Sequence, residues 1–172
     1  MVFSLLLSYS WFIIITYISN GSLLAGVSLI KKMKGSRLRK LLLTPIDFNR
    51  KFTDDQLIIG DHKPVAGIMI TAFWSVLFSL IYHETFAYFL PFAVFLGDIA
   101  GSFLKRRLRI KHGRPLFIVD QINFFAAGYL IVLYLGIAFP LIDFLQLAVI
   151  TIFVHIGTNA FAYKIGIKDE PW

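Results

Sequence analysis

Long apolar runs separated by short polar segments make up most of this chain of 172 residues. Five of the runs are each long enough to cross a hydrocarbon core of about 30 Å, which takes roughly 20 helical residues. The pattern therefore predicts an all-α membrane protein with five transmembrane helices, formed by a single integral-membrane domain over residues 1–172. We expect the spans at residues 2–30, 64–82, 85–104, 119–142 and 144–163.

The composition agrees with this prediction. Hydrophobic residues make up 58% of the chain, which is far too apolar for an ordinary soluble domain. There are no cysteines, so a disulfide framework, a thiolate metal site and a cysteine nucleophile are excluded. The first positive charge is Lys31, so the basic start of a cleavable signal peptide is missing, and we expect the first apolar run to remain in the mature protein.

The positions of the basic residues predict the orientation of the chain. Of the 17 Lys and Arg residues, nine lie between the first and second spans, six between the third and fourth, and two after the fifth. Because such residues collect on the cytoplasmic side, we expect the N-terminus outside and both long loops and the C-terminus in the cytoplasm. The net charge of +7 is thus explained by the membrane, and we expect no nucleic-acid partner.

The segment at residues 97–121 joins carboxylates to a dense basic loop. On a helix, Asp98, Ser102 and Lys105 are spaced so that they share one face. Gly97 and Gly101 form a small-xxx-small edge, which lets membrane helices approach closely. The spacing predicts a carboxylate, a hydroxyl and an ammonium group that point into one space beside a close helix contact.

Asp98 lies seven residues before Lys105, which is about 10 Å along a helix. An unpaired carboxylate at that depth costs roughly 2.5 to 3.5 kcal/mol, so either a Lys or Arg or a divalent cation must compensate it. Asp120 opens the next span at a matching depth. Two carboxylates from adjacent helices suit Mg²⁺, which is usually held by one or two carboxylates and substrate phosphates. Asp98 and Asp120 are therefore candidate metal ligands.

Polar residues also occur within the first and the last predicted spans. Asn20-Gly21-Ser22 falls about two thirds of the way along the first run, where the helix can end or kink. Asn20 is either satisfied by a neighbouring helix or lines a cavity, because unpaired polar groups are costly in the membrane. On the last span we interpret His155 as a packing residue and Asn159 as a polar contact near the inner surface.

The two stretches of the first long loop differ in character. Residues 31–40 are strongly basic and are typical of an anchor on anionic lipid headgroups. Residues 45–63 mix carboxylates, cations and turn formers, and fit either a solvated loop or a lid that binds phosphate. The end of this stretch brings Asp61 and Lys63 to the mouth of the second span.

These residues resemble a known family. Gly97-Asp98, the run from Ser102 to Arg106, and Asp120 resemble the GD…SxxKR…D signature of membrane CTP:phosphatidate cytidylyltransferases. The similarity is greater to their archaeal relatives, the CDP-archaeol synthases, and extends along nearly the whole chain. The further similar positions are Asn20, Pro45-Ile46-Asp47, Gly60 to Lys63, Gly67, Asn159, Lys168 and Pro171-Trp172.

The resemblance implies a Mg²⁺-dependent membrane enzyme whose site faces the cytoplasm. Such an enzyme transfers CMP from CTP to 2,3-bis-O-(geranylgeranyl)glycerol 1-phosphate, a prenylated glycerol phosphate lipid, and releases pyrophosphate. The resemblance implies Asp98, Lys105 and Asp120 as catalytic residues, with Asp98 and Asp120 as the metal ligands. The residues implied in binding CTP and its phosphates are Asn20, Asp61, Lys63, Ser102, Lys105, Arg106 and Asn159.

Three alternatives remain beside this interpretation. A phosphatidate cytidylyltransferase would use the same chemistry on an ester lipid. A CDP-alcohol phosphotransferase would carry DGxxAR followed by GxxxDxxxD, and the carboxylates here are not spaced in that way. A transporter or a non-catalytic membrane subunit would not need the carboxylates, although a transporter usually shows repeated halves with polar groups at the midplane.

Overall fold

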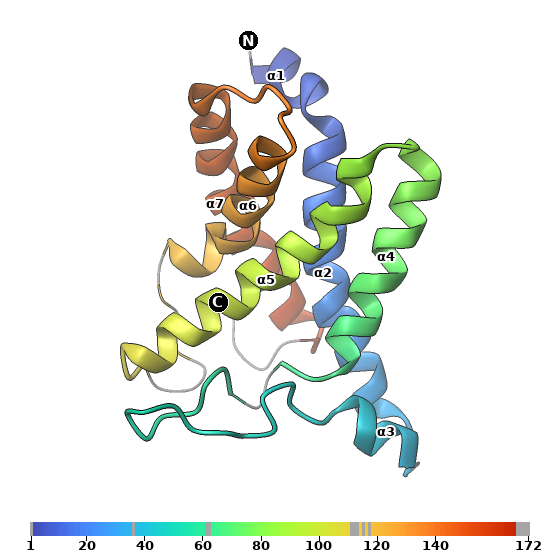
Figure 1. The fold of residues 1–172 in the computed structure, drawn as a ribbon, viewed down its shortest axis with the longest axis vertical. Helices are drawn as coiled ribbons and strands as arrows, with labels where there is room; N and C mark the ends of the chain where they lie inside the picture. The colour runs from blue at the N-terminus through green and yellow to red at the C-terminus, as the bar shows by residue number, and fades with distance from the viewer. Residues whose placement is uncertain are drawn as a thin grey trace.

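The computed structural model describes residues 2–35, 37–60, 63–110, 114, 116 and 118–167. Over these residues the chain is helical, and its only extended pairing consists of two isolated bridges in the loop between α3 and α4. The helices are α1 (Val2–Ser8), α2 (Ser10–Lys32), α3 (Arg37–Leu42), α4 (Ala66–Tyr82), α5 (Thr85–Arg107), α6 (Val119–Tyr134) and α7 (Leu141–Lys164) (Figure 1).

The helix lengths fit a membrane protein. The helices α2, α5 and α7 have 23, 23 and 24 residues and are long and apolar enough to cross a membrane. The helices α4 and α6 are also apolar but have only 17 and 16 residues. The predicted all-α membrane architecture is therefore confirmed.

Helix α5 lies at the centre of the bundle and packs against α2, α4 and α6, whereas α7 packs on α6 at the edge (Figure 1). Glycines permit the closest of these contacts. A Cβ atom added to Gly97 would lie 2.6 Å from both the Asn123 carbonyl oxygen and the Ala127 Cβ atom. One added to Gly101 would collide with the Asn123 side chain. The predicted close contact at the glycine edge is confirmed, and its partner is α6.

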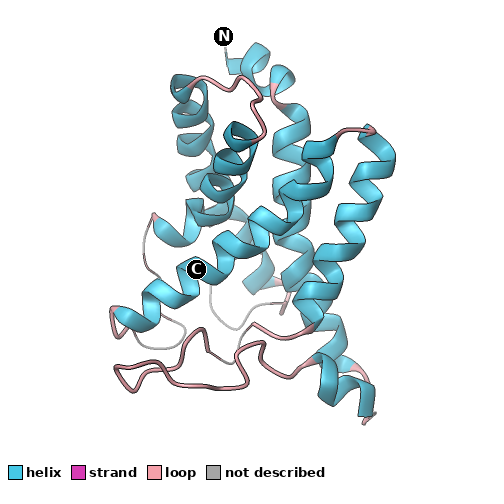
Figure 2. Ribbon diagram, viewed as in Figure 1, coloured by secondary structure: helices cyan, strands magenta, loops and turns pink. Residues whose placement is uncertain are grey.

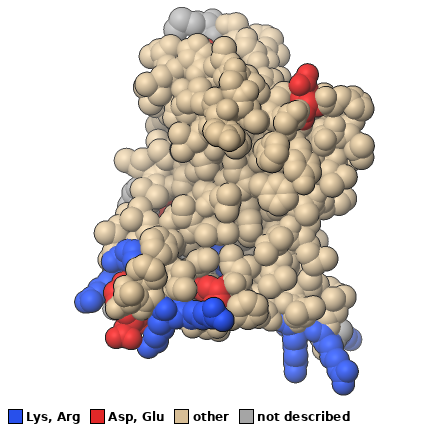
Figure 3. All heavy atoms as spheres, in the orientation of Figure 1, with Lys and Arg blue, Asp and Glu red and all other residues tan. Residues whose placement is uncertain are grey.

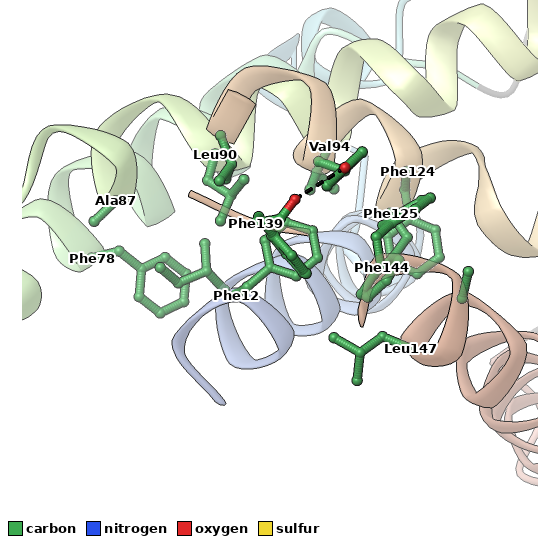
Figure 4. Packing of buried hydrophobic residues seen from close by; sticks show 14 residues of the cluster. Phe12, Phe78, Ala87, Leu90, Val94, Phe124, Phe125, Phe139, Phe144 and Leu147 are labelled. Atoms are coloured by element: carbon green, nitrogen blue, oxygen red, sulfur yellow. Dashed lines mark hydrogen bonds between the residues drawn. The ribbon is translucent and has the colours of Figure 1, made fainter. Parts of the chain in front are cut away.

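An aromatic core joins α2, α6 and α7 away from the long loop (Figure 4). The Phe12 ring meets the edges of Phe125 and Phe139, with ring centroids 4.8 and 5.1 Å apart. Tyr129 stacks on Phe144 at 4.1 Å, and its hydroxyl donates to the Phe139 carbonyl oxygen. These rigid contacts fix the relative heights of the three helices.

The predicted interruption of the first span is wrong in position. The chain breaks at Tyr9, between α1 and α2, and α2 then continues through Asn20, Gly21 and Ser22 without ending. The Ser22 hydroxyl donates to the Ser19 carbonyl oxygen at 2.9 Å, which satisfies this polar group inside the helix. Ser22 is therefore compatible with a continuous helix at this point.

Two other predicted boundaries also shift. Helix α6 ends at Tyr134, well before residue 142, and Gly136 adopts a positive φ of 74° in the turn that follows. Pro140 then precedes the first residue of α7, a position where its missing N–H costs nothing. Helix α5 runs past residue 104 to Arg107, so the basic residues Lys105 and Arg106 lie on the helix itself.

The Lys and Arg side chains gather at one end of the molecule, which we call the basic end (Figure 3). It comprises the C-terminal ends of α2 and α5, α3, and the loop between α3 and α4, which runs beneath the bundle (Figure 2). The described residues of this loop, 43–60 and 63–65, are called the loop at residues 43–65 below. The turn between α4 and α5, with Glu84, lies at the opposite end. This separation agrees with the asymmetry of basic residues in the sequence.

Candidate active site at the basic end

The loop at residues 43–65 is folded and closed at its neck. The Ile46 N–H donates to the Lys63 carbonyl oxygen at 2.9 Å, and the Val65 N–H donates to that of Thr44 at 2.9 Å. These bonds hold Lys63 directly before α4. The loop is therefore held in a fixed fold at its neck, although residues 48–53 in its middle are exposed.

Asp47 organises the inside of the loop. Its buried carboxylate accepts hydrogen bonds from the backbone N–H groups of Asn49 (3.0 Å), Ile59 (2.8 Å) and Gly60 (2.9 Å). Burial by itself raises the pKa of Asp47, but the N–H donors of Gly60, Ile59 and Asn49 outweigh it and hold the pKa below its ordinary value. An ionised Asp47 thus ties the two ends of the loop together.

Two ion pairs form the centre of the site. Lys63 Nζ contacts Asp98 Oδ2, and Lys105 Nζ lies 2.9 Å from Asp120 Oδ2. Asp120 Oδ2 also accepts a hydrogen bond of 2.8 Å from the Leu116 N–H. All four side chains are between 18% and 25% exposed, so the pairs are shielded by protein yet remain accessible.

Both carboxylates belong to helices that touch. Asp98 follows Gly97 on α5. On α6, Asp120 lies about one turn before Asn123, and Asn123 is the residue that Gly97 packs against. Asp98 pairs with Lys63, a cation from the loop. Among the described residues, no group of three or more His, Asp or Glu side chains is placed to hold a metal ion.

Arg106 and Ser102 lie beside these pairs. The Ser102 hydroxyl donates to the Asp98 carbonyl oxygen at 3.1 Å, one turn back along α5. Arg106 lies against the loop, since a Cβ added to Gly60 would come 3.8 Å from its Nε atom. This Nε is buried and has no hydrogen-bond partner within the described part of the chain. Arg106 is therefore a cation with a free donor at the point where the loop meets α5.

Comparison with known proteins decides the family. The family described as "CarS-like: CDP-archaeol synthase" matches residues 2–172 of this chain. The chain belongs to the CDP-archaeol synthase family. It is therefore an enzyme of the family that the sequence signature indicates, and a multi-pass membrane protein.

Curated CDP-archaeol synthases are similar over most of their length. The protein from Thermofilum pendens is 36% identical over 163 residues, covering 91% of this chain and 76% of the relative. The protein from Methanocaldococcus jannaschii is 29% identical over the full length of both chains. A solved structure, described as an intramembrane enzyme for archaeal membrane lipids biosynthesis, aligns with a TM-score of 0.57 at 24% identity. It covers 81% of this chain and 92% of that one, and shows that the fold is shared.

In this CDP-archaeol synthase family member, Asn20 and Asn159 lie away from the ion pairs. The rings of Tyr17 on α2 and His155 on α7 both contact Phe124 on α6, at 5.8 and 5.3 Å. His155 thus packs as expected. Asn20 and Asn159 follow about one helical turn nearer the basic end, and both are half-buried. They lie on two other helices and take no part in the ion pairs of the site.

Several expected residues lie outside the described part of the chain. They include Asp61 among the candidate site residues, and His62, Lys168, Pro171 and Trp172 among the positions that resemble the family.

Two side chains of this family member were not singled out from the sequence. Gln121, next to Asp120, is only 2% exposed, and its Oε1 atom accepts no hydrogen bond within the described residues. Arg107 bridges α5 to the loop. Arg107 stands in a run of basic residues, so nothing in its sequence context separates it from its neighbours.

Proposed function

We propose that this protein transfers CMP from CTP to 2,3-bis-O-(geranylgeranyl)glycerol 1-phosphate at the basic end of the bundle, with release of pyrophosphate. The observation that carries the proposal is the pairing of Asp98 with Lys63 and of Asp120 with Lys105, beside Arg106. This arrangement supplies carboxylates for a cation and cations for phosphates within one site.

The residues of the chain bind and orient the reactants. Lys63, Lys105 and Arg106 hold the triphosphate of CTP, and Ser102 contributes a hydrogen bond. The lipid phosphate oxygen then attacks the α-phosphorus, the bond from this phosphorus to the bridging oxygen breaks, and pyrophosphate leaves. The lipid phosphate is already an anion, so the reaction needs no side-chain nucleophile or base. Positioning and neutralisation of charge on the phosphate oxygens are therefore the main contributions of the protein.

The donor set fits Mg²⁺. Asp98 and Asp120 offer carboxylate oxygens from two touching helices, and substrate phosphates complete the usual coordination of this ion. When bound, Mg²⁺ supplies Lewis-acid polarisation of the phosphate oxygens. The lysines would then transfer from the carboxylates to the phosphates.

Residues around this centre complete the nucleotide site. We assign Asn20 and Asn159 to contacts with CTP, because each lies about one helical turn nearer the basic end than Tyr17 or His155, whose rings both pack on Phe124 of α6. Asp61 is assigned to the same site from its position between Gly60 and Lys63 in the sequence.

We also propose an orientation of the chain in the membrane. All five helices α2, α4, α5, α6 and α7 cross the membrane as one domain, with the N-terminus outside and the basic end in the cytoplasm. The contact of α4 and α6 with the central, long α5 supports their crossing in spite of their lengths of 17 and 16 residues. CTP would enter from the cytoplasm, and the lipid laterally between helices.

The test is pyrophosphate release by purified protein in detergent with CTP, Mg²⁺ and either the unsaturated ether-lipid phosphate or phosphatidic acid. We expect release with the ether lipid, its loss in Asp98→Ala, and normal release in Glu84→Ala at the opposite end. Release with phosphatidic acid alone would favour the ester-lipid alternative. No release with either lipid from folded protein would favour a transporter or a non-catalytic subunit.

A further inference from the structure

Arg107, the last residue of α5, makes four contacts with the loop and with its own helix. Its Nη2 donates to the Leu57 carbonyl oxygen at 2.6 Å. Its Nη1 lies 3.1 Å from Asp54 Oδ1, as an ion pair without hydrogen-bond alignment. The guanidinium carbon lies 4.7 Å from the centre of the Phe52 ring and 4.9 Å from that of Phe103. The side chain is only 18% exposed.

These contacts join two parts of the chain that are far apart in sequence. Phe52, Asp54 and Leu57 belong to the loop, and Phe103 belongs to α5. Phe52 and Phe103 also meet edge to face, with centroids 5.6 Å apart. A planar, always charged guanidinium is suited to such a place, because it stacks on rings and reaches two acceptors at once.

The same loop carries residues of the proposed site. Asp47 fastens residues 59 and 60 to the start of the loop, and Gly60 packs beside Arg106. The neck of the loop then places Lys63 against Asp98. A shift of the loop along α5 would therefore move Lys63 away from Asp98 and Gly60 away from Arg106 at the same time.

We propose that Arg107 is a positioning residue that fixes the loop at residues 43–65 on α5, and so sets the place of Lys63 and Gly60 relative to Arg106 and Asp98. Arg107 acts through the loop and need not contact either substrate. This inference rests on the proposed function, because it gives Lys63 and Arg106 their role in holding the triphosphate.

The experiment compares Arg107→Ala, Arg107→Lys and Asp54→Asn with the wild type and with Arg109→Ala. Arg109 is exposed and lies two residues further along, so its variant is a matched control for loss of charge. We expect Arg107→Ala to lower kcat/KM for CTP about ten- to a hundredfold, since a misplacement of about 1 Å can cost roughly a hundredfold. The loss should fall mainly on KM for CTP, with KM for the lipid unchanged.

For the two conservative variants, we expect the rise in KM for CTP to be smaller the more of these contacts each variant keeps. Arg107→Lys keeps the charge but loses the fork and the planar stacking, so we expect partial rescue. Asp54→Asn changes only a partly exposed loop side chain, so it should fold normally and show a smaller rise in KM for CTP. A merely stabilising role of Arg107 would instead lower the amount of active enzyme, and both KM values would stay unchanged.

Hydrogen exchange provides a readout that needs no activity. We expect the amides of Ile58, Ile59 and Gly60 to exchange faster in Arg107→Ala, with α2 and α6 unchanged. Unchanged exchange in the loop would overturn the inference. Faster exchange with an unchanged KM for CTP would overturn the role in positioning. If the wild type itself releases no pyrophosphate, the proposed function fails, whereas the exchange result still decides whether Arg107 holds the loop.

Discussion

At the scale of single residues, the most informative position is Asp98. Its carboxylate has a lysine from another segment as its partner. The Asp98→Asn variant keeps the size of the side chain but removes its charge. We expect pyrophosphate release to fall about a hundredfold or more, as for the loss of other groups that stabilise charge in a transition state. Release near the wild-type rate would show that Asp98 has only a structural role.

The lowered pKa of Asp47 predicts how the stability of the protein depends on pH. Its folded-state pKa is below the ordinary value of 3.8, so the ionised carboxylate stabilises the protein above that pH. This contribution is lost as the pH falls through the folded-state pKa. We expect the difference in thermal midpoint between wild type and Asp47→Asn to be constant above about pH 5 and to narrow below it. A difference that grows on acidification would contradict the assigned sign.

The sequence predicted some of these residues better than others. Asp98, Ser102 and Lys105 were expected on one helical face because their spacing is a local property, and α5 indeed carries them. The partner of Asp98 could not be predicted, since Lys63 is 35 positions away in sequence and Lys105 and Arg106 are much nearer. Arg107 was missed because the difference between a solvated and a stacked arginine depends on where Phe52 lies in space.

At the scale of elements, the contact between α5 and α6 sets the geometry of the site. A methyl group on Gly97 would meet the backbone of Asn123, which cannot move without displacing α6. On Gly101 it would meet only the end of the Asn123 side chain, which can rotate away. We therefore expect Gly97→Ala to destabilise the protein by about 1–3 kcal/mol, and Gly101→Ala by less.

A matched control exists on α2. A Cβ atom on Gly21 would meet nothing within 4 Å, so Gly21→Ala should leave the thermal midpoint equal or slightly higher. The midpoints of the three variants in detergent test this order. If Gly97→Ala and Gly21→Ala lowered the thermal midpoint equally, the contact between α5 and α6 would not limit the stability of the protein.

The elements also show where sequence patterns fail. The existence of every long helix followed from apolar runs that exceed the length of ordinary helices. The C-terminal end of α6 and the break at Tyr9 did not, because apolar residues continue across both places. At these places tertiary contacts determine where the helices end. Tyr9 stacks on Phe139, with centroids 4.1 Å apart, and its hydroxyl donates to Asp143.

At the scale of the whole molecule, the separation of charge gives a test of orientation. The chain has no native cysteine, so single cysteines can be introduced without background. Lys51→Cys in the loop and Glu84→Cys at the opposite end are both exposed. We expect a membrane-impermeant thiol reagent to label Glu84→Cys in intact cells and Lys51→Cys only after lysis. The reverse pattern would invert the proposed topology.

The central place of α5 has a consequence for how the chain can change length in evolution. Each residue inserted into or deleted from a helix turns everything beyond it by about 100°. Between Gly97 and Arg107 such a change would direct Asp98 and Lys105 to different sides, and would also move Arg107 away from Phe52. Insertions and deletions should therefore collect in the turns at the opposite end, while the spacing along this stretch of α5 stays constant among homologues.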